Sequence, residues 1–438
     1  MRLLTFHGGV HPDDGKAMSK DRPITPMEAG DTVYISLSQH IGAPAKPVVE
    51  KGDHVLAGQL IGEAGGFVSS PVYATVSGEV TGFQKCRTPQ GGMADCVVIR
   101  NDHQNESVEF EPADFHALTK EEILDRIKKG GIVGMGGAGF PTHVKLSPKE
   151  PEKIDYVLVN GAECEPYLTS DYRRMLEEPE KLVGGLQIIL KLFPKAKGYI
   201  CIEANKMDCV EAMRKACAGI DNIEVKVLKV KYPQGAERML IYAATGRKLN
   251  SRLLPADVGC VVDNVDTVVG IYNAVALGRP LMHRIITVTG DAVKEPCNYY
   301  VPYGMLFSEL LEKAGGLKND AEKIIIGGPM MGNPVFELEI PVIKTSSALL
   351  ALTKDEVAAL EPTACINCGR CSDVCPGQVL PSRLSVFAEN GDAESFQAYG
   401  GMECCECGCC SFICPAKRPL TQVIKSMRKV VLASRKKG

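Results

Sequence analysis

The sequence predicts a multidomain protein of the α/β and α+β classes, and three observations support this prediction. Residues 1–118 contain short alternating apolar runs interrupted by Gly, Pro and Asp, which is typical of β structure. From residue 119 onward, strand-like and helical patterns alternate, which favours a parallel sheet covered by helices. Ten of the 18 cysteines lie within residues 365–438, so we expect a separate unit with its own chemistry there.

The composition sets bounds without naming a reaction. The 438 residues are 45% hydrophobic, which leaves room for several modest domains with cores of their own. A net charge of −3 argues against nucleic acid as the main partner. No apolar stretch approaches the roughly twenty residues of a membrane helix, and the chain opens without an apolar signal segment. We therefore expect a protein of a reducing compartment, either soluble or lying on a membrane without crossing it.

The β-rich start contains a predicted strand at residues 32–36. Residues 48–61 and 70–76 resemble the half-barrel of lipoyl and biotinyl carrier domains. The carrier lysine is missing from the hairpin where that family would place it, so we expect a scaffold or docking module. His7 and His11 flank a Gly-Gly-Val segment, and metal binding is one interpretation of this pair. A glycine-rich turn with partly buried imidazoles is the better interpretation because no third ligand is evident.

The central α/β region begins with a capping box at Thr119 and Glu122. This box predicts a helix that places Ile123 and Ile127 on one face and ends at the Gly-Gly pair of residues 130–131. Ligands of such sheets bind beyond the carboxyl ends of the strands. Apolar patterns predict strands at residues 154–159, 199–202 and 223–230, with helices at 172–192 and 207–218 between them.

A glycine-rich loop at residues 134–139 contains the Gly-x-Gly-x-x-Gly pattern of a dinucleotide-binding turn. Alone it is weak evidence, because Pro141 interrupts the helix that should follow and the preceding strand is short. A loop without function is the alternative. Three polar segments favour a nucleotide site, since short loops rich in Asn, Gly and carboxylates do not help to pack a core. They are residues 160–166, 232–238 and 263–267.

Two cysteine runs, beginning at Cys365 and Cys404, repeat the spacing Cys-x2-Cys-x2-Cys-x3-Cys-Pro. This is the spacing of a protein with two [4Fe–4S] clusters, in which the fourth cysteine of each run reaches the other cluster. One cluster would be held by Cys365, Cys368, Cys371 and Cys414, and the other by Cys404, Cys407, Cys410 and Cys375.

Structural zinc and disulfides are the alternatives for these cysteines. Zinc sites use two separated Cys-x2-Cys pairs, and disulfides require an oxidising compartment, so neither fits as well. Two further cysteines, Cys405 and Cys409, fall outside the repeated spacing, and we interpret them as spare thiols that are packed or solvated.

The polar segments and the glycine loop resemble the flavin- and NADH-binding segments of the flavoprotein subunit of respiratory complex I. Residues 288–296 and 301–304, with a helix ending at Gly315-Gly316, are similar to the β-grasp module of that family. The order of the parts resembles the C subunit of the Rnf complex across nearly the whole chain. The resemblance implies a lipoyl-like barrel-sandwich hybrid domain (1–118), a Rossmann-like FMN/NADH-binding domain (119–282), an SLBB-like β-grasp domain (283–345), a bacterial-type two-[4Fe–4S] ferredoxin domain (346–422) and a basic tail (423–438).

The same resemblance implies roles for single residues. Departures from the complex I pattern at Ala162, Cys164 and Ala236 bear on NADH selectivity. No residue is expected to act as a catalytic base or nucleophile, because the cofactor carries the chemistry. The implied contacts are Gly134, Gly136, Gly137 and Gly139 at the flavin phosphate and the nicotinamide cofactor; Lys145 balancing the phosphate charge; Asn160, Glu163 and Glu165 at the isoalloxazine and nicotinamide; Tyr232, Gly235 and Glu237 on the other wall; and Asn264 and Thr267 at the phosphate end.

The expected function follows from the two kinds of cofactor. A hydride brings two electrons and a [4Fe–4S] cluster accepts one, so noncovalent FMN would convert between NAD(H) and the clusters. The resemblance implies a peripheral, NADH-interacting subunit on the cytoplasmic side of the inner membrane. Its partners would be the other subunits of a ferredoxin:NAD+ oxidoreductase, including a ferredoxin-like iron–sulfur subunit, and those partners would couple electron flow to ion transport. The alternatives are a soluble flavin and iron–sulfur cobalamin reductase and a structural adaptor with an empty flavin fold.

The end of the chain, residues 416–438, holds eight basic residues and no acidic one. Several apolar residues in it share a helical face, which predicts either a solvated terminal helix or a contact with anionic lipid or an acidic partner subunit.

Overall fold

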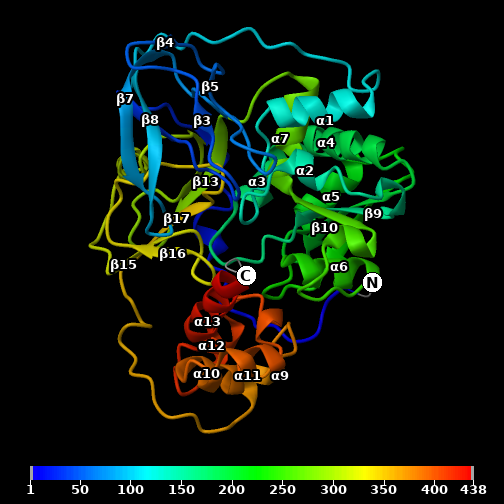
Figure 1. Cartoon of the computed structure of the whole chain (residues 1–438), viewed down its shortest axis with the longest axis vertical. Coiled ribbons are helices and arrows are strands. Elements are labelled where there is room, and N and C mark those ends of the chain that lie inside the picture. The colour runs from blue at the N-terminus through cyan, green and yellow to red at the C-terminus, as the bar shows by residue number, and fades with distance from the viewer. Residues whose placement is uncertain (1–2, 436–438) are drawn as a thin grey trace.

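The computed structural model describes residues 3–435 and consists of four regions arranged along the chain (Figure 1). The first contains two small antiparallel sheets. One has the order β2 (Thr32–Ser36), β8 (Met93–Asn101), β7 (Gly78–Arg87) and β4 (His54–Val55), and the other has β3 (Lys46–Pro47), β5 (Leu60–Glu63) and β6 (Val72–Tyr73). The strand predicted at residues 32–36 is confirmed, and its Val33 and Ile35 are fully buried in the core of this region.

The second region contains a four-stranded parallel sheet in the order β11 (Ile223–Leu228), β10 (Lys197–Glu203), β9 (Tyr156–Gly161) and β12 (Cys260–Asn264). Alternate residues of the strands point to opposite faces. One face packs with α4 (Pro179–Leu192), α5 (Met207–Ala216) and α7 (Val265–Ala276), and the other with α6 (Glu237–Thr245). The predicted parallel sheet covered by helices is therefore confirmed.

The remaining helices of this region include α1 (Lys120–Lys129), α2 (Thr142–Lys145) and α3 (Ser170–Glu177). The capping box of α1 is present: the Thr119 hydroxyl accepts from the Glu122 backbone N–H. The single helix predicted over residues 172–192 is wrong, because α3 and α4 are separate. Glu178 leaves the helical conformation and Pro179, which cannot donate a backbone hydrogen bond, begins the next helix.

A six-stranded sheet forms the third region. Its order is β1 (Thr25–Pro26), β14 (Cys297–Pro302), β13 (His283–Thr289), β17 (Ala348–Leu352), β15 (Lys323–Ile326) and β16 (Asn333–Val335). Helix α8 (Phe307–Lys313) packs its Phe307 and Leu310 into the core. Because β1 and β17 belong to this sheet, the region extends beyond the predicted range 283–345 at both sequence ends.

The last region, residues 353–435 of the described chain, contains helices and no strand. The helices are α9 (Arg370–Asp373), α10 (Pro381–Glu389), α11 (Ala393–Ala398), α12 (Cys409–Ile413) and α13 (Leu420–Arg435). Helix α13 crosses the boundary predicted at residue 422, and its Ile424, Met427 and Val431 are buried in the core of this region. Residues 423–435 therefore are not a separate tail, and the last three residues lie outside the described chain. No helix of the described chain has both the length and the apolar character needed to cross a membrane.

A buried ion pair joins the second region to the third. The Asp266 carboxylate on α7 accepts from Arg174 Nε on α3 at 2.8 Å and lies 4.0 Å from Arg284 Nε on β13. The side chains of Arg174 and Asp266 are 9% and 3% exposed. Loss of one member of such a group leaves the opposite charge buried without compensation.

We expect Asp266→Asn to lower the free energy of unfolding by about 3–5 kcal/mol, because Arg174 would lose its buried counter-charge. Urea unfolding monitored by circular dichroism measures this effect. Asp125→Asn, which removes an exposed ion pair with Lys129, is the matched control and should change stability by less than about 0.5 kcal/mol. Equal effects of the two substitutions would contradict the role of Asp266.

Candidate functional site

The carboxyl ends of β9 and β12 form the place where a ligand of the parallel sheet would bind. Strand order reverses here, since β10 and β11 lie on one side of β9 and β12 on the other. Asn160 and Asn264 are register partners at these two strand ends. Asn264 also caps α7, accepting from the Asp266 backbone N–H at 2.9 Å. The site therefore combines a topological switch point with the amino terminus of a 12-residue helix.

The glycine loop lies against this helix terminus. A Cβ added to Gly136 would stand 2.9 Å from Asn264 Cβ, so only glycine allows this approach. The backbone N–H of Met135 donates to Thr267 Oγ1 at 2.9 Å, and its carbonyl accepts from Arg284. Residues 136–138 are exposed, and an added Cβ on Gly137 would meet no atom within 4 Å. Hydrogen bonds at Met135 thus hold the loop in place, while the backbone of residues 136–138 remains exposed.

The predicted phosphate-balancing lysine lies beside the loop. Lys145 Nζ donates to Asp263 Oδ1 at 2.9 Å and to the Val262 carbonyl at 2.8 Å. It also lies 3.9 Å from the position of a Cβ added to Gly134. Burial lowers the pKa of Lys145, but the Asp263 carboxylate and Glu237 outweigh it and the net shift is upward. Lys145 is therefore a cation at neutral pH, and Glu237 lies near it at the start of α6.

The opposite wall of the site is built from two loops that bond to each other. Asn160 Nδ2 donates to the Gly235 carbonyl at 2.8 Å, and the Gly235 N–H points to Cys164 Sγ at 3.2 Å. Tyr232 is 2% exposed, and its hydroxyl donates to the Cys407 carbonyl at 2.7 Å. Tyr232 therefore connects the predicted nucleotide site to the second cysteine run.

The Glu163 and Glu165 side chains bond to backbone groups of neighbouring segments. The Glu163 carboxylate accepts from the Asp171 backbone N–H at 2.7 Å, at the start of α3. Glu165 accepts from the N–H groups of Met330 and Met331 at 2.7 and 3.1 Å, which ties its loop to the third region. Burial raises the pKa of both carboxyls. In this structure the two side chains hold the loop rather than face open space.

Two buried lysines that the sequence analysis missed support the same loop. Lys206 Nζ donates to the Ala162 carbonyl at 2.7 Å, and Lys16 Nζ donates to the Glu165 carbonyl at 3.0 Å and to that of Leu168. Lys16 precedes the predicted half-barrel and is distant in sequence from the loop that it contacts. Only its position after the glycine-rich segment could have marked it.

The amino-terminal segment passes between the cysteine-rich region and the loops at residues 160–166 and 232–238, which we name the flavin-side loops. Val10 exchanges backbone hydrogen bonds with Tyr232, and the Gly9 N–H donates to the Val374 carbonyl at 2.8 Å. Gly8 and Gly9 have φ near +82° and +83°. A Cβ on Gly8 would lie 2.9 Å from the Val374 carbonyl oxygen, so the close approach requires glycine. The expected glycine-rich turn is confirmed.

The alternative metal site at His7 and His11 finds no support in the geometry. Both histidines are exposed, so the expectation that their imidazoles are partly buried is wrong. Among residues 3–435, no three His, Cys, Asp or Glu side chains converge on a point where a single metal ion could bind.

The two cysteine runs adopt the same backbone conformation. Asn367 and Glu406, two residues after the first cysteine of each run, have φ of +54° and +58°. Gly369 and Gly408 follow with φ of +77° and +85°, and each begins a short helix. The two runs therefore form an internal structural repeat, which the cysteine spacing predicts.

Cysteines of the two runs pack against each other. Cys375 of the first run lies in one group with Cys404 of the second. Cys371 of the first run lies in another with Cys410 and Cys414 of the second. Burial raises the pKa of Cys404 and Cys410 to about 11. Some members of each predicted ligand set are therefore close together, but no three cysteines of residues 3–435 are arranged to hold a metal ion.

Cys405 and Cys409 lie on the side that faces Tyr232. Cys409 is fully buried with Val10 and Tyr232, and Cys405 is partly buried in the same group. Cys409 is therefore packed, as the interpretation of these residues as spare thiols requires.

Comparison with protein families identifies three of the four regions. Residues 4–104 match the RnfC barrel sandwich hybrid domain, residues 127–273 the Nuo51 FMN-binding domain and residues 285–334 the SLBB domain. The glycine loop, Lys145 and the polar loops of the candidate site all lie within the FMN-binding match.

One solved structure with a similar fold is an NAD+-reducing [NiFe]-hydrogenase in the air-oxidized state, at a TM-score of 0.50 and 20% identity. The similarity covers 64% of this chain and 54% of that one.

Curated relatives extend the match to nearly the whole chain. The C subunit of the proton-translocating ferredoxin:NAD(+) oxidoreductase complex of Clostridium ljungdahlii is 47% identical, over 97% of this chain and 94% of that protein. The C subunit of the Na(+)-translocating complex of Acetobacterium woodii is 43% identical, over 99% and 98% respectively. The chain therefore belongs to the Rnf family, as a C subunit of ion-translocating ferredoxin:NAD(+) oxidoreductase complexes.

Proposed function

We propose that this chain is the NADH-interacting electron-transfer subunit of a membrane-bound ferredoxin:NAD+ oxidoreductase. It passes electrons between NAD(H), noncovalent FMN and two [4Fe–4S] clusters. The full-length relation to two such C subunits supports this function. The observation that carries it is the hydrogen bond between Tyr232 and Cys407, because it joins the flavin-side loops to a cysteine run with cluster spacing.

The residues of the candidate site fit FMN. Bound FMN would exchange two electrons with NAD(H) and single electrons with the clusters. Its phosphate fits the exposed backbone of residues 136–138 at the amino terminus of α7, where the helix dipole favours an anion. Lys145 supplies a cation beside the loop, and Asn160 and Gly235 border the site on the other side.

The cysteine-rich region fits two clusters with crossed ligands. The repeated left-handed residues turn the backbone so that three cysteines of each run are available on one short loop. One cluster, which we name the inner cluster because its ligand Cys407 is buried, would be held by Cys404, Cys407, Cys410 and Cys375. The other, which we name the outer cluster because Cys365 and Cys368 are exposed, would be held by Cys365, Cys368, Cys371 and Cys414.

Exposure gives an order to the two clusters. Cys407 contacts Tyr232 and is buried, whereas Cys365 and Cys368 are exposed. Electrons would therefore pass between the flavin site and the inner cluster, and between the outer cluster and a partner.

The partners are the other subunits of the membrane complex, including a ferredoxin-like iron–sulfur subunit at the outer cluster. Those subunits would couple electron flow to ion transport. The chain would sit peripherally on the cytoplasmic side of the inner membrane. The names of the relatives support membership of such a complex.

Anaerobically purified protein should contain FMN and about eight irons per chain, the content of two cubanes. It should also transfer electrons from NADH to an artificial one-electron acceptor. Flavin release, iron and sulfide analysis and stopped-flow spectroscopy measure these properties. Protein without FMN and without NADH-dependent reduction would contradict the proposal.

Gly137→Val should weaken FMN binding at least tenfold, about 1.4 kcal/mol, because a side chain there occupies the open space above the loop. Fluorescence titration of the flavin-free protein with FMN measures the affinity. Gly92→Val, at an exposed hairpin glycine with similar room, is the control and should bind FMN as the wild type does. Unchanged affinity in Gly137→Val would place the phosphate elsewhere.

Cys375→Ala should lower the iron content from about eight to about four per chain, because it removes one ligand of the inner cluster. Cys405→Ala, a nearby thiol outside both sets, should retain about eight irons. Iron and sulfide analysis of both variants tests the crossed ligation. A larger loss in Cys405→Ala than in Cys375→Ala would overturn the assignment.

A further inference from the structure

Two buried carboxyls that the electron path does not use meet beside the candidate flavin site. The side chain of Glu163 is 3% exposed. Its Oε1 accepts from the Asp171 backbone N–H at 2.7 Å, while its Oε2 has no hydrogen-bond partner and lies 3.8 Å from Lys16 Nζ. Glu163 also adopts a left-handed backbone conformation, with φ of +44°. The Oε2 atom of Glu163 is therefore available to carry a proton.

Asp171 connects this pair to the glycine loop. Its Oδ2 accepts from Asn264 Nδ2 at 2.7 Å, and Asn264 packs directly against Gly136. A single hydrogen-bonded residue thus separates the Asp171 carboxyl from the exposed backbone that would hold the flavin phosphate.

The charges that face the pair come from several elements. Around Asp171 they are Glu163, Asp266 on α7 and Arg284 on β13. Around Glu163 they are Lys16 near the amino terminus and Lys206 before α5. Burial first, and then Glu163 and Asp266, raise the pKa of Asp171 well above its ordinary value. Burial also raises the pKa of Glu163, against the opposing effect of the two lysines. A carboxyl buried beside another carboxylate takes up a proton more readily than an exposed one.

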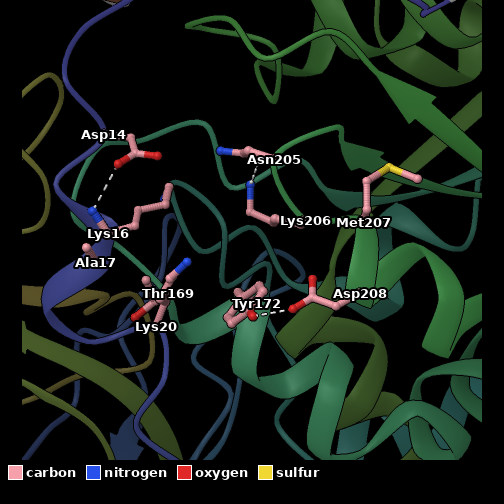
Figure 2. A pocket seen from close by; sticks show the side chains of 10 residues that line it. All are labelled: Asp14, Lys16, Ala17, Lys20, Thr169, Tyr172, Asn205, Lys206, Met207 and Asp208. Carbon is pink, nitrogen blue, oxygen red and sulfur yellow. Dashed lines mark hydrogen bonds between the residues drawn. The ribbon is translucent and has the colours of Figure 1, made fainter.

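A cavity of about 290 Å³ lies beside the residues that surround Glu163, although Glu163 and Asp171 do not themselves line it (Figure 2). Its lining includes Lys16, Thr169, Tyr172 and Lys206. Three of these touch or face Glu163: Lys16 at 3.8 Å, Tyr172 through its backbone N–H at 3.4 Å, and Lys206 through its charge. A polar cavity of this size holds water. It lies at the carboxyl end of β10, away from the glycine loop at β9 and β12.

We propose that Glu163 and Asp171 hold a proton that exchanges with water through this cavity as the flavin site gains and loses electrons. The proposal rests on the proposed function. Hydride transfer breaks a C–H bond of NADH and delivers two electrons and one proton to the flavin, so negative charge remains in the site. Water then protonates the carboxyl pair and offsets that charge. When the electrons leave singly for the clusters, the proton on the flavin and the proton on the carboxyl pair would both return to water, the latter by the same cavity.

The test uses the full chain loaded with FMN under anaerobic conditions. The two-electron potential of the flavin is measured from pH 6 to 9 by spectroelectrochemistry. The slope of this potential against pH gives the number of protons taken up per two electrons. We expect this number to be lower in Asp171→Asn than in the wild type, by up to one. Asp125→Asn, at an exposed carboxylate on α1 that does not line the cavity, is the matched control and should keep the wild-type slope.

Bound FMN with the same slope in the wild type and Asp171→Asn would overturn this proposal alone. Protein that binds no FMN would overturn the proposed function and this proposal with it. A second measurement uses the wild-type protein and so does not depend on whether a variant folds. The infrared difference spectrum of reduced minus oxidised protein should contain the C=O band of a newly protonated carboxyl. The absence of that band would also overturn the proposal. Where Asp171→Asn or Glu163→Gln folds, the loss of the band assigns it to the pair.

Discussion

The close packing of Gly8, Gly9 and Val10 between two other regions is the constraint on which the rest of the structure depends. On one side, Val10 forms a two-way backbone bridge with Tyr232. On the other, Gly8 and Gly9 contact Val374 and Cys375. Neither contact tolerates a side chain at the glycines. Because Tyr232 in turn bonds to Cys407, this segment helps to fix the flavin-side loops relative to both cysteine runs, together with the bonds that Glu403 forms with Arg238 and Ser251.

These backbone hydrogen bonds at residues 9 and 10 hold the loop at Tyr232 beside the first cysteine run. The buried Asp266 carboxylate on α7, which lies 4.0 Å from Arg284 on β13, performs the same task between the parallel-sheet region and the six-stranded sheet. Arg284 extends it to the glycine loop through the Met135 carbonyl. The loop is therefore positioned by two regions at once.

Much of the fold could be predicted from local patterns. Strand periodicity located the parallel sheet, and the cysteine spacing predicted the structural repeat because each thiol must follow a fixed turn. The break between α3 and α4 was missed, since the apolar pattern continues across Pro179 and hides the missing hydrogen bond. The directions of Glu163 and Glu165 could not be predicted either. Their partners, the start of α3 and the loop at Met330, depend on contacts that local patterns do not encode.

The glycine segment has a consequence for the order of folding. Gly9 bonds to Val374, so this contact can form only once the chain has been made as far as residue 374. Contacts of such high sequence separation form late, after the loop entropy of the intervening chain has been overcome. The contact of the amino-terminal segment with the cysteine-rich region therefore forms after that region has folded. A chain that stops before residue 374 cannot form this contact.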